Sequence, residues 1–522
     1  MKKITRHLLT VAFSAFIAVA TGLCESLSAA EAAKPNIVFI LADDLGWRDL
    51  GCYGSTFHET PNIDRLAARG VMFTQAYADS PLCSPTRASI QTGLHPARIG
   101  ITAPACHENF VRLEKKLGDP DPKSKVLQAK SLTRLKTEYF TLAEAFREAG
   151  YTTAHFGKWH IGHNLPNRKN DRFEPKNQGF ESDFPHTPTV GGPVTGFFAP
   201  WKFIKDPPLE GNAGEHIEDR MSSEAEKFIL AHASTGSEQA KKPFYLNYCA
   251  YSVHMPAQGK SDYVEHFKKR ADPKNPQNNP VYAAMVKSLD DAVGRLMNAV
   301  DQAGIADRTI IVFFSDNGGN VDPPKVTVPE GYENRPLACN YPLRSGKLSL
   351  YEGGTRAPCI IVWPGKIKPG TENGALFQSV DFYPTLLAMC GLKPHADIKL
   401  DGLNQEGTLL GGASPRDRIF CHFPHGNEKI PIPGFLPGTY VRKGDWKLIR
   451  FYADNDDGSD RLELYNLKDD VGETRNLAPD NPEIVKDLNG LISGFLKDTD
   501  AVIPVRNPDY IADAKQTPSG GE

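Results

Sequence analysis

The longest apolar runs of the chain predict strands. Residues 36–42 and 309–314 are apolar at almost every position, as expected for strands covered on both faces of a mostly parallel sheet. Shorter apolar runs predict further strands at 151–156, 244–251 and 359–363. By periodicity alone, the last two of these runs also fit buried helix segments.

Helical signals lie between these runs. Residues 61–69 end before Gly70, and Gly commonly follows a helix. Thr141 and Glu144 form a capping box at the start of another helix. A third helix is predicted over 282–303, where apolar residues recur at helical spacing. The alternation predicts an α/β fold, in which a large, mostly parallel sheet is flanked by helices.

The C-terminal third predicts a separate small sheet. Residues 442–449 and 462–467 have the pattern of antiparallel strands. From Asn507 the chain is rich in Pro, Gly, Ser and charge, which predicts disorder. The expected organisation is a signal peptide at 1–33, a large catalytic domain at 34–400, a C-terminal subdomain at 401–506 and a disordered tail at 507–522.

The N-terminus predicts export. Lys2, Lys3 and Arg6 precede an apolar run over residues 8–23, and small residues follow, as in a secretory signal peptide. A lipoprotein anchor through Cys24 is the weaker alternative, because the residues before it do not form a lipobox. Since no other stretch approaches about 18 apolar residues, we expect no stable membrane span and a periplasmic or secreted protein.

Charge and cysteine content narrow the class of protein. The net charge of −3 argues against a general nucleic-acid partner or a membrane-surface role. Seven of the nine cysteines remain once Cys24 and Cys83 are set aside, and their pairing cannot be deduced from spacing. A chain of this size does not depend on disulfides for its core.

Polar clusters follow four of the predicted strands. Asp43 and Asp44 follow the first, residues 158–160 the second, 252–256 the third and 316–319 the fourth. One such cluster alone is most often an ordinary turn. Ligands of open α/β sheets bind beyond the carboxyl ends of the strands, so four clusters in this position predict a site.

A cysteine precedes a further predicted helix. Ser84 is expected as N-cap, Pro85 as the first helical residue and Gly93 as the residue after the helix. Cys83 then lies before the helix N-terminus, with Arg87 one turn away, which favours an oxyanion. The alternative is an inert, buried cysteine beside a surface arginine.

The sequence of this helix resembles a known signature. Residues 83–87 match the sulfatase pattern C-x-P-[ST]-R, with Thr86 where Ser is commoner, and Thr-Gly follows at 92–93. Residues 344–358, which include Lys347, are similar to the lysine segment of the same family. The chain thus resembles the formylglycine-dependent, arylsulfatase-like sulfatases, which implies an alkaline-phosphatase-like fold.

The resemblance implies a modified nucleophile and a bound cation. A maturation enzyme would oxidise Cys83 to formylglycine (3-oxoalanine), whose hydrate is the nucleophile, with Asp316 as the likeliest proton acceptor. Asp43, Asp44, Asp316 and Asn317 offer hard oxygen ligands, which indicate Ca²⁺ or Mg²⁺ rather than structural zinc. In sulfatases these positions, together with the modified cysteine, surround one divalent cation, usually Ca²⁺.

Cationic and protonatable residues complete the predicted site. By resemblance, Arg87, Lys158 and Lys347 would hold the sulfate oxygens. His254 would protonate the departing alcohol, and His160 would take the proton that lets sulfate leave.

The sequence therefore predicts a sulfatase that acts on a sulfate ester, most plausibly of a saccharide. Two alternatives stay open: a phosphodiesterase or phosphonate monoester hydrolase of the same superfamily, and a non-catalytic binder of sulfated glycans.

A basic insertion lies between the two predicted helices that begin at Ser84 and Thr141. Residues 112–136 hold eight Lys or Arg against three acidic residues, an excess of +5. This segment is either a solvated loop and helix or a landing surface for a polyanionic glycan. His107, His163 and His186 are candidates for shaping a nearby substrate pocket.

Overall fold

The computed structural model of this chain describes residues 34–162, 173–185, 192–204, 208–233, 242–321 and 336–511. The predicted signal peptide at 1–33, as well as His163 and His186, lies outside the described residues. Among the described helices, none combines the length and the apolar character needed to span a lipid bilayer.

An eight-stranded sheet forms the centre, with the order β12-β2-β11-β10-β1-β9-β7-β8. Its strands are β1 (Asn36–Ala42), β2 (Val71–Phe73), β7 (Thr152–Gly157), β8 (Ser182–Phe184), β9 (Phe244–Cys249), β10 (Thr309–Ser315), β11 (Cys359–Val362) and β12 (Thr371–Asn373). Within this sheet only the two pairings of β11 are antiparallel. The mostly parallel sheet is confirmed, and both runs that also fitted buried helices form strands.

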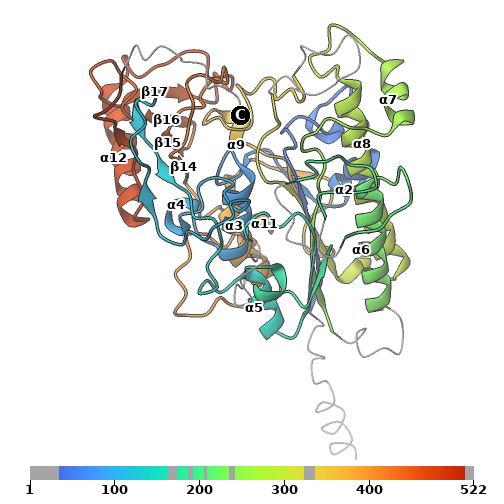
Figure 1. The fold of residues 1–522 in the computed structure, drawn as a ribbon. Coiled ribbons are helices and arrows are strands. Elements are labelled where there is room, and N and C mark those ends of the chain that lie inside the picture. The colour runs from blue at the N-terminus through green and yellow to red at the C-terminus, as the bar shows by residue number, and fades with distance from the viewer. Residues whose placement is uncertain are drawn as a thin grey trace, which may run out of the picture. The chain divides into compact units, whose positions relative to one another are not determined.

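Helices cover both faces of this sheet (Figure 1). On one face lie α2 (Pro61–Arg69), α6 (Ile217–Ala233) and α8 (Pro280–Gln302), and on the other lie α3 (Cys83–Thr92), α5 (Leu142–Glu148) and α10 (Phe382–Met389). Alternate residues of β1 enter the two cores: Val38 and Ile40 pack with the first set, Ile37 and Phe39 with the second. This two-sided burial explains why the strand is apolar throughout.

The four central parallel strands end at one level. Ala42 of β1 pairs with Ser315 of β10, and Leu41 pairs with Cys249 of β9. Cys249 in turn pairs with Gly157 of β7. The polar clusters that follow these strands therefore emerge at a common edge of the sheet.

The C-terminal sheet has four antiparallel strands, and the single strand predicted at 442–449 covers parts of two of them. They are β14 (Arg418–Phe423), β15 (Gly438–Lys443), β16 (Trp446–Phe451) and β17 (Arg461–Asn466). Gly444 has φ +58° and turns the chain between β15 and β16, so the predicted run 442–449 is a hairpin. α12 (Pro482–Asp498) packs on one face of the sheet. The sequence analysis missed β14 and α12, and the boundary near residue 400 remains a proposal.

The basic insertion forms short strands rather than a loop and helix. β4 (Lys116–Leu117) pairs with β6 (Ala129–Lys130), and β5 (Val126–Leu127) pairs with β18 (Val505–Arg506). Asn507 was expected to begin a disordered tail, but it is 2% exposed and its side chain donates to the carbonyls of Asp121 and Ser124. Residues 507–511 therefore belong to the folded part of the chain, and the rest of the predicted tail, residues 512–522, lies outside the described residues.

The remaining described elements are short. They are η1 (Gly51–Tyr53), β3 (Ala76–Tyr77), α4 (Pro96–Ile99), η2 (Pro175–Asn177), α7 (Ser261–Lys268), η4 (Ala306–Arg308), α9 (Glu352–Thr355), β13 (Phe377–Gln378), η5 (Ser379–Asp381) and α11 (Glu406–Leu409). No disulfide joins cysteines within the described parts of the chain.

Candidate active site

The helix α3 begins at Cys83 itself, which lies in its first turn and is 1% exposed. Leu82 is the N-cap, so the predicted N-cap role of Ser84 is wrong. Because Ser84 lies inside the first turn, it does not cap the helix, and its hydroxyl donates to the carbonyl of His160 at 2.5 Å. Gly93 ends the helix with φ +67°, as predicted.

Four acidic or amide side chains meet at the ends of β1 and β10, and all are buried. The backbone N–H of Asp44 donates to Asp316 Oδ1 at 3.2 Å. Asn317 Nδ2 donates to Asp44 Oδ1 at 2.8 Å. Asp43 faces the same cluster, since one of its oxygens lies within 4.8 Å of ligand atoms of both Cys83 and Asp316.

Three cations pair with these carboxylates. Lys158 Nζ donates to Asp43 Oδ2 at 2.7 Å, and Lys347 Nζ donates to Asp44 Oδ2 at 2.6 Å. Arg87 Nε donates to Asp316 Oδ2 at 2.8 Å. The backbone carbonyl of Lys158 accepts a second bond from the guanidinium at 2.7 Å, which fixes its plane. Three pairs of opposite charges thus lie in the cluster that contains the thiol of Cys83.

Two orphaned oxygens indicate that the donor set fits a divalent cation. Asp43 Oδ1 and Asn317 Oδ1 are buried and accept no hydrogen bond within the described residues. A buried acceptor without a partner is costly, and a hard cation would satisfy both. Potential ligand atoms also lie within 4.8 Å of one another in the group of Asp43, Asp44 and His254.

Ionisation in the cluster follows from burial and from the pairs. Burial raises the pKa of the Cys83 thiol, so the unmodified residue is not a reactive thiolate. Burial also raises the pKa of Asp316 to about 6, against the opposing effect of Arg87. Burial acts to raise the pKa of Asp44 as well, but Lys347 and His254 outweigh it and lower that pKa.

The two predicted histidines lie beside the same cations. His254 Nδ1 donates to the carbonyl of Met255 at 2.8 Å, which leaves Nε2 facing Asp44 Oδ2 at 3.8 Å. His160 Nδ1 is buried without a hydrogen-bond partner in the described residues. Burial, reinforced by Lys158 for His160 and by Lys347 for His254, lowers the pKa of both rings, so both are neutral at rest.

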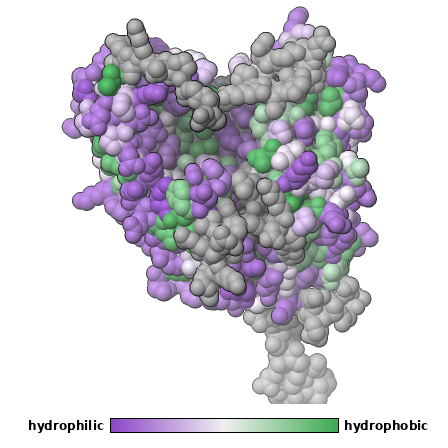
Figure 2. Space-filling view, in the orientation of Figure 1, coloured by the Kyte–Doolittle hydropathy of each residue, from purple (hydrophilic) through white to green (hydrophobic). Residues whose placement is uncertain are grey.

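The structure therefore brings every predicted catalytic and metal residue into one cluster. The further candidate His107 is not part of it, because its side chain is 50% exposed beside Glu108. In Figure 2 the drawn face is hollowed between the C-terminal sheet and α8, near the position of α9 in Figure 1.

Supporting residues hold the loops that carry the cluster, and the sequence analysis missed them. Glu218 of α6 is fully buried and accepts from the backbone N–H groups of Tyr251 and Ser252, at 2.6 and 2.7 Å, just before His254. Asn340 bonds both the N–H and the carbonyl of Gly319. Neither residue is near its partner in sequence, and neither belongs to a motif, so no sequence signal marked them.

A close backbone approach explains one glycine of the site. A Cβ on Gly318 would lie 1.8 Å from the carbonyl oxygen of Gly353 in α9. Any side chain at 318 would therefore push α9 away from the loop that carries Asp316 and Asn317.

Family models match most of the chain. The sulfatase model matches residues 35–392, and a model of the N-sulphoglucosamine sulphohydrolase C-terminal region matches residues 346–495. The chain belongs to the sulfatase family. This membership confirms the family that residues 83–93 predicted.

Named relatives of this sulfatase are similar over most of their length. It is 32% identical to N-acetylgalactosamine-6-sulfatase of Rattus norvegicus, over 81% of this chain and 75% of the relative. It is 31% identical to human arylsulfatase A, over 92% of this chain and 90% of the relative. It is 28% identical to the N-acetylgalactosamine-6-O-sulfatase of Bacteroides thetaiotaomicron, over 88% of this chain and 92% of the relative. The protein is accordingly a sulfuric ester hydrolase.

Solved structures share the fold of this sulfatase. The crystal structure of Ps i-CgsB matches with a TM-score of 0.69 and 26% identity, over 92% of this chain and 95% of that one. Ps i-CgsB in complex with k-i-k-neocarrahexaose matches with the same TM-score and coverage at 25% identity. The alkaline-phosphatase-like fold implied by the sequence is thereby confirmed.

Proposed function

We propose that this sulfatase is exported and removes sulfate from a carbohydrate ester, with the formylglycine form of Cys83 as its nucleophile. The observation that carries the proposal is the approach of Cys83, Asp43 and Asp316, whose potential ligand atoms lie within 4.8 Å of one another. Carbohydrate sulfates are named in the relatives from Rattus and Bacteroides, which supports a sugar substrate here.

The cluster supplies both the nucleophile and its activation. Residue 83, oxidised by a formylglycine-generating enzyme and hydrated, would provide the attacking hydroxyl. Asp43, Asp44, Asp316 and Asn317 would hold Ca²⁺, with Mg²⁺ as the alternative, whose positive charge favours ionisation of that hydroxyl. Asp316 would be the proton acceptor, because one of its oxygens and the sulfur of Cys83 lie within 4.8 Å of each other.

Sulfate binding falls to the three cations of the cluster, Arg87, Lys158 and Lys347. Lys158 and Lys347 approach the cluster from different loops, and each already donates to a carboxylate at its edge. Together with Arg87 they place positive charge where the sulfate oxygens gain negative charge during bond cleavage. Because Arg87 and Lys158 are buried and the side chain of Lys347 is only 12% exposed, their interaction with sulfate is screened less than in water.

The two histidines would act at different steps. His254 Nε2 is the free ring nitrogen of a side chain whose other nitrogen is already bonded, so it would carry the proton to the departing alcohol. Negative charge on bound sulfate would raise the pKa of His254, so that the ring is protonated before the alcohol departs. His160 Nδ1 would then take a proton from residue 83 as sulfate leaves.

Parallel assays test the proposal. Protein made in a host that oxidises sulfatase cysteines should hydrolyse 4-nitrophenyl sulfate and 6-O-sulfated N-acetylgalactosamine, and it should act poorly on bis(4-nitrophenyl) phosphate. A preference for the phosphodiester would assign the site to phosphodiester hydrolysis. A protein whose Cys83 stays an unmodified thiol in that host, and which hydrolyses none of these substrates, would leave only glycan binding.

A further inference from the structure

The basic insertion does not present a uniform positive surface. Arg134 is fully buried. Three of its lysines form ion pairs: Lys115 with Asp500 at 2.9 Å, Lys125 with Glu428 at 3.3 Å and Lys136 with Glu138 at 3.3 Å. Much of the excess positive charge of residues 112–136 is thus balanced within the protein. The segment therefore does not offer a uniform surface for a polyanionic glycan.

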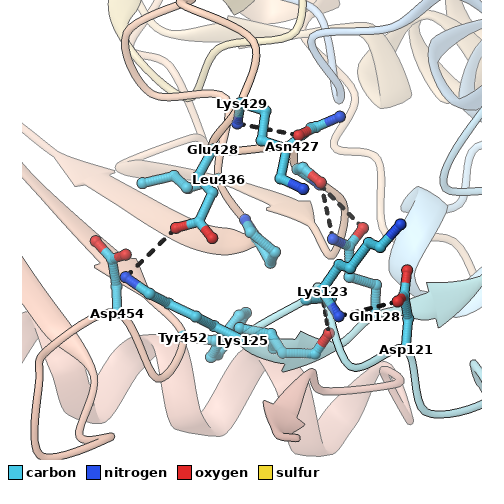
Figure 3. A pocket seen from close by; sticks show the side chains of 14 residues that line it. Asp121, Lys123, Lys125, Gln128, Asn427, Glu428, Lys429, Leu436, Tyr452 and Asp454 are labelled. Atoms are coloured by element: carbon cyan, nitrogen blue, oxygen red, sulfur yellow. Dashed lines mark hydrogen bonds and ion pairs between the residues drawn. The ribbon is translucent and has the colours of Figure 1, made fainter. Parts of the chain in front are cut away.

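A pocket of about 250 Å³ lies between this insertion and the loop after β14 (Figure 3). Lys123 and Gln128 of the insertion face Asn427 and Lys429 of the loop across it. Tyr452, at the end of β16, also lines the pocket. No residue of the catalytic cluster lines it.

Two ammonium groups of the pocket are available to a ligand. Lys123 and Lys429 are exposed and have no carboxylate partner within the described residues, whereas Lys125 is held by Glu428. They come from the two walls of the pocket, so an anionic ligand bound there would have an ammonium group on either side. Surface lysines repel each other weakly in water, and an anion removes that repulsion.

The rest of the lining suits a sugar ring. Carboxylates of Asp121 and Asp454 and the side-chain amides of the two walls can bond hydroxyl groups. Val126, Leu436 and Pro437 provide apolar surface for the faces of a ring. The volume lies just below the range of about 300–1,000 Å³ typical of drug-sized ligands, which corresponds to about one saccharide unit.

The far wall is bonded to the segment that carries Lys347. Ser345 and Ser349 both donate to the carbonyl of Pro433 in the loop after β14, at 2.9 and 2.7 Å. Gly426, in the same loop, is bonded through its N–H and its carbonyl to the side chain of Gln128. One loop therefore contacts both the insertion and the segment that carries Lys347.

We propose that this pocket is a distal subsite, which binds a second anionic unit of the glycan whose sulfate ester is hydrolysed at residue 83. This inference rests on the proposed function and deepens it: the substrate is an oligosaccharide or polymer with charge on more than one unit. Lys123 and Lys429 bind the anionic group of that unit, and the neighbouring carboxylates bind its hydroxyls.

The test compares two double variants with the same change in charge. Lys123→Gln with Lys429→Gln removes both free ammonium groups of the pocket. Lys116→Gln with Lys130→Gln removes two lysines that face each other in the β4–β6 pair of the same insertion but do not line the pocket. Calorimetry in a Cys83→Ala background would measure binding of a chondroitin 6-sulfate hexasaccharide and of an ι-carrageenan hexasaccharide, which lacks carboxylates, at about 0.15 M salt.

We expect the pocket variant to raise Kd about tenfold or more, since it loses two charge-assisted contacts, and the control variant to change Kd less than twofold. With matured enzyme, KM for the hexasaccharide should rise in the same way, while kcat/KM for 4-nitrophenyl sulfate stays unchanged. If the pocket variant loses affinity for the chondroitin hexasaccharide alone, the group bound by the two lysines is a carboxylate. If it loses affinity for both hexasaccharides, that group is a sulfate.

Equal effects of the two double variants, or no effect of the pocket variant, would overturn the subsite. So would a wild-type protein that binds the hexasaccharides no more tightly than 6-O-sulfated N-acetylgalactosamine. Because binding is measured without turnover, this result stays separate from the proposed function, which fails if wild-type protein hydrolyses no sulfate ester.

Discussion

Ser84 Oγ lies 2.5 Å from the carbonyl oxygen of His160, so a hydrogen bond ties the first turn of the nucleophile helix to the loop that follows β7. Both residues are buried. The neighbour of the nucleophile thus positions a proposed proton acceptor instead of capping its own helix.

Ser84→Ala should cost about 1–3 kcal/mol of unfolding free energy, because it leaves a buried carbonyl without its donor. It should also lower kcat, since the loop that carries His160 loses an anchor. Urea denaturation and steady-state assays measure the two effects. Ser288→Ala is the control: its hydroxyl is equally buried but bonds only Ala284 of its own helix. A loss of kcat of the same size in both variants would contradict the positioning role.

Cys83 should be found as formylglycine after expression with a maturation system, and Cys83→Ala should abolish turnover without unfolding the protein. Burial raises the pKa of the thiol and keeps it protonated, so the unmodified residue is a poor nucleophile. Mass spectrometry of the peptide that contains residue 83 is the measurement. Full activity in protein that carries only the thiol would rule the mechanism out.

Removal of metal ligands should remove both the cation and activity. Asp43→Ala and Asn317→Ala each take away one of the two orphaned oxygens, and the site offers few replacements. Elemental analysis of purified protein should show about one Ca²⁺ or Mg²⁺ in the wild type and less in both variants. Asp301→Ala, an exposed carboxylate change on α8, should leave metal content unchanged. Stoichiometric zinc, or undiminished activity after chelation, would contradict the assignment.

Replacement of the two histidines should impair different steps. His254→Ala should slow sugar sulfates about 10²- to 10⁴-fold and 4-nitrophenyl sulfate clearly less, because nitrophenolate leaves without an acid. His160→Ala should give a burst of alcohol followed by slow release of sulfate. Stopped-flow assays on both substrates separate these outcomes. Equal slowing of both substrates in His254→Ala would refute its role as acid, and the absence of a burst would refute that of His160.

The stability contributed by Glu473 should fall as the pH rises from about 4.5 to about 7. Burial raises the pKa of Glu473 to about 7, with Lys447 opposing the shift, so the folded protein binds a proton that the unfolded chain releases near pH 4.5. The loss attributable to this group is at most about 3 kcal/mol. Glu473→Gln should flatten this dependence.

The quantity to measure is the difference between wild type and variant, because other buried carboxyls titrate in the same range. Urea denaturation at pH 5 and pH 7.5 gives it. Glu483→Gln, which changes an exposed carboxylate on α12, should leave the dependence as in the wild type. An identical slope in Glu473→Gln would mean that Glu473 is ionised throughout this range.

The central sheet and the site could be predicted because their signals are local. A strand buried on both faces is apolar at almost every position, as residues 36–42 are, and parallel strands end at a common edge. The polar residues directly after those strands, such as Asp43 and Lys158, must then lie close together. The signature around Cys83 needs only one helical turn, so it too was visible in the sequence.

The tertiary structure alone decided which partners those residues have. Ser84 is a residue type typical of N-caps, yet the helix begins one residue earlier, and the Ser84 hydroxyl donates to a carbonyl 76 positions away. Glu218 is 33 residues from the amide of Tyr251 that it holds, and no periodic pattern records such a contact. The charge of the insertion was likewise evident from sequence, but only folding showed that Lys125 is paired with Glu428 while Lys123 is not. Long-range hydrogen bonds and ion pairs depend on the position of each side chain in space, which the order of residues does not state.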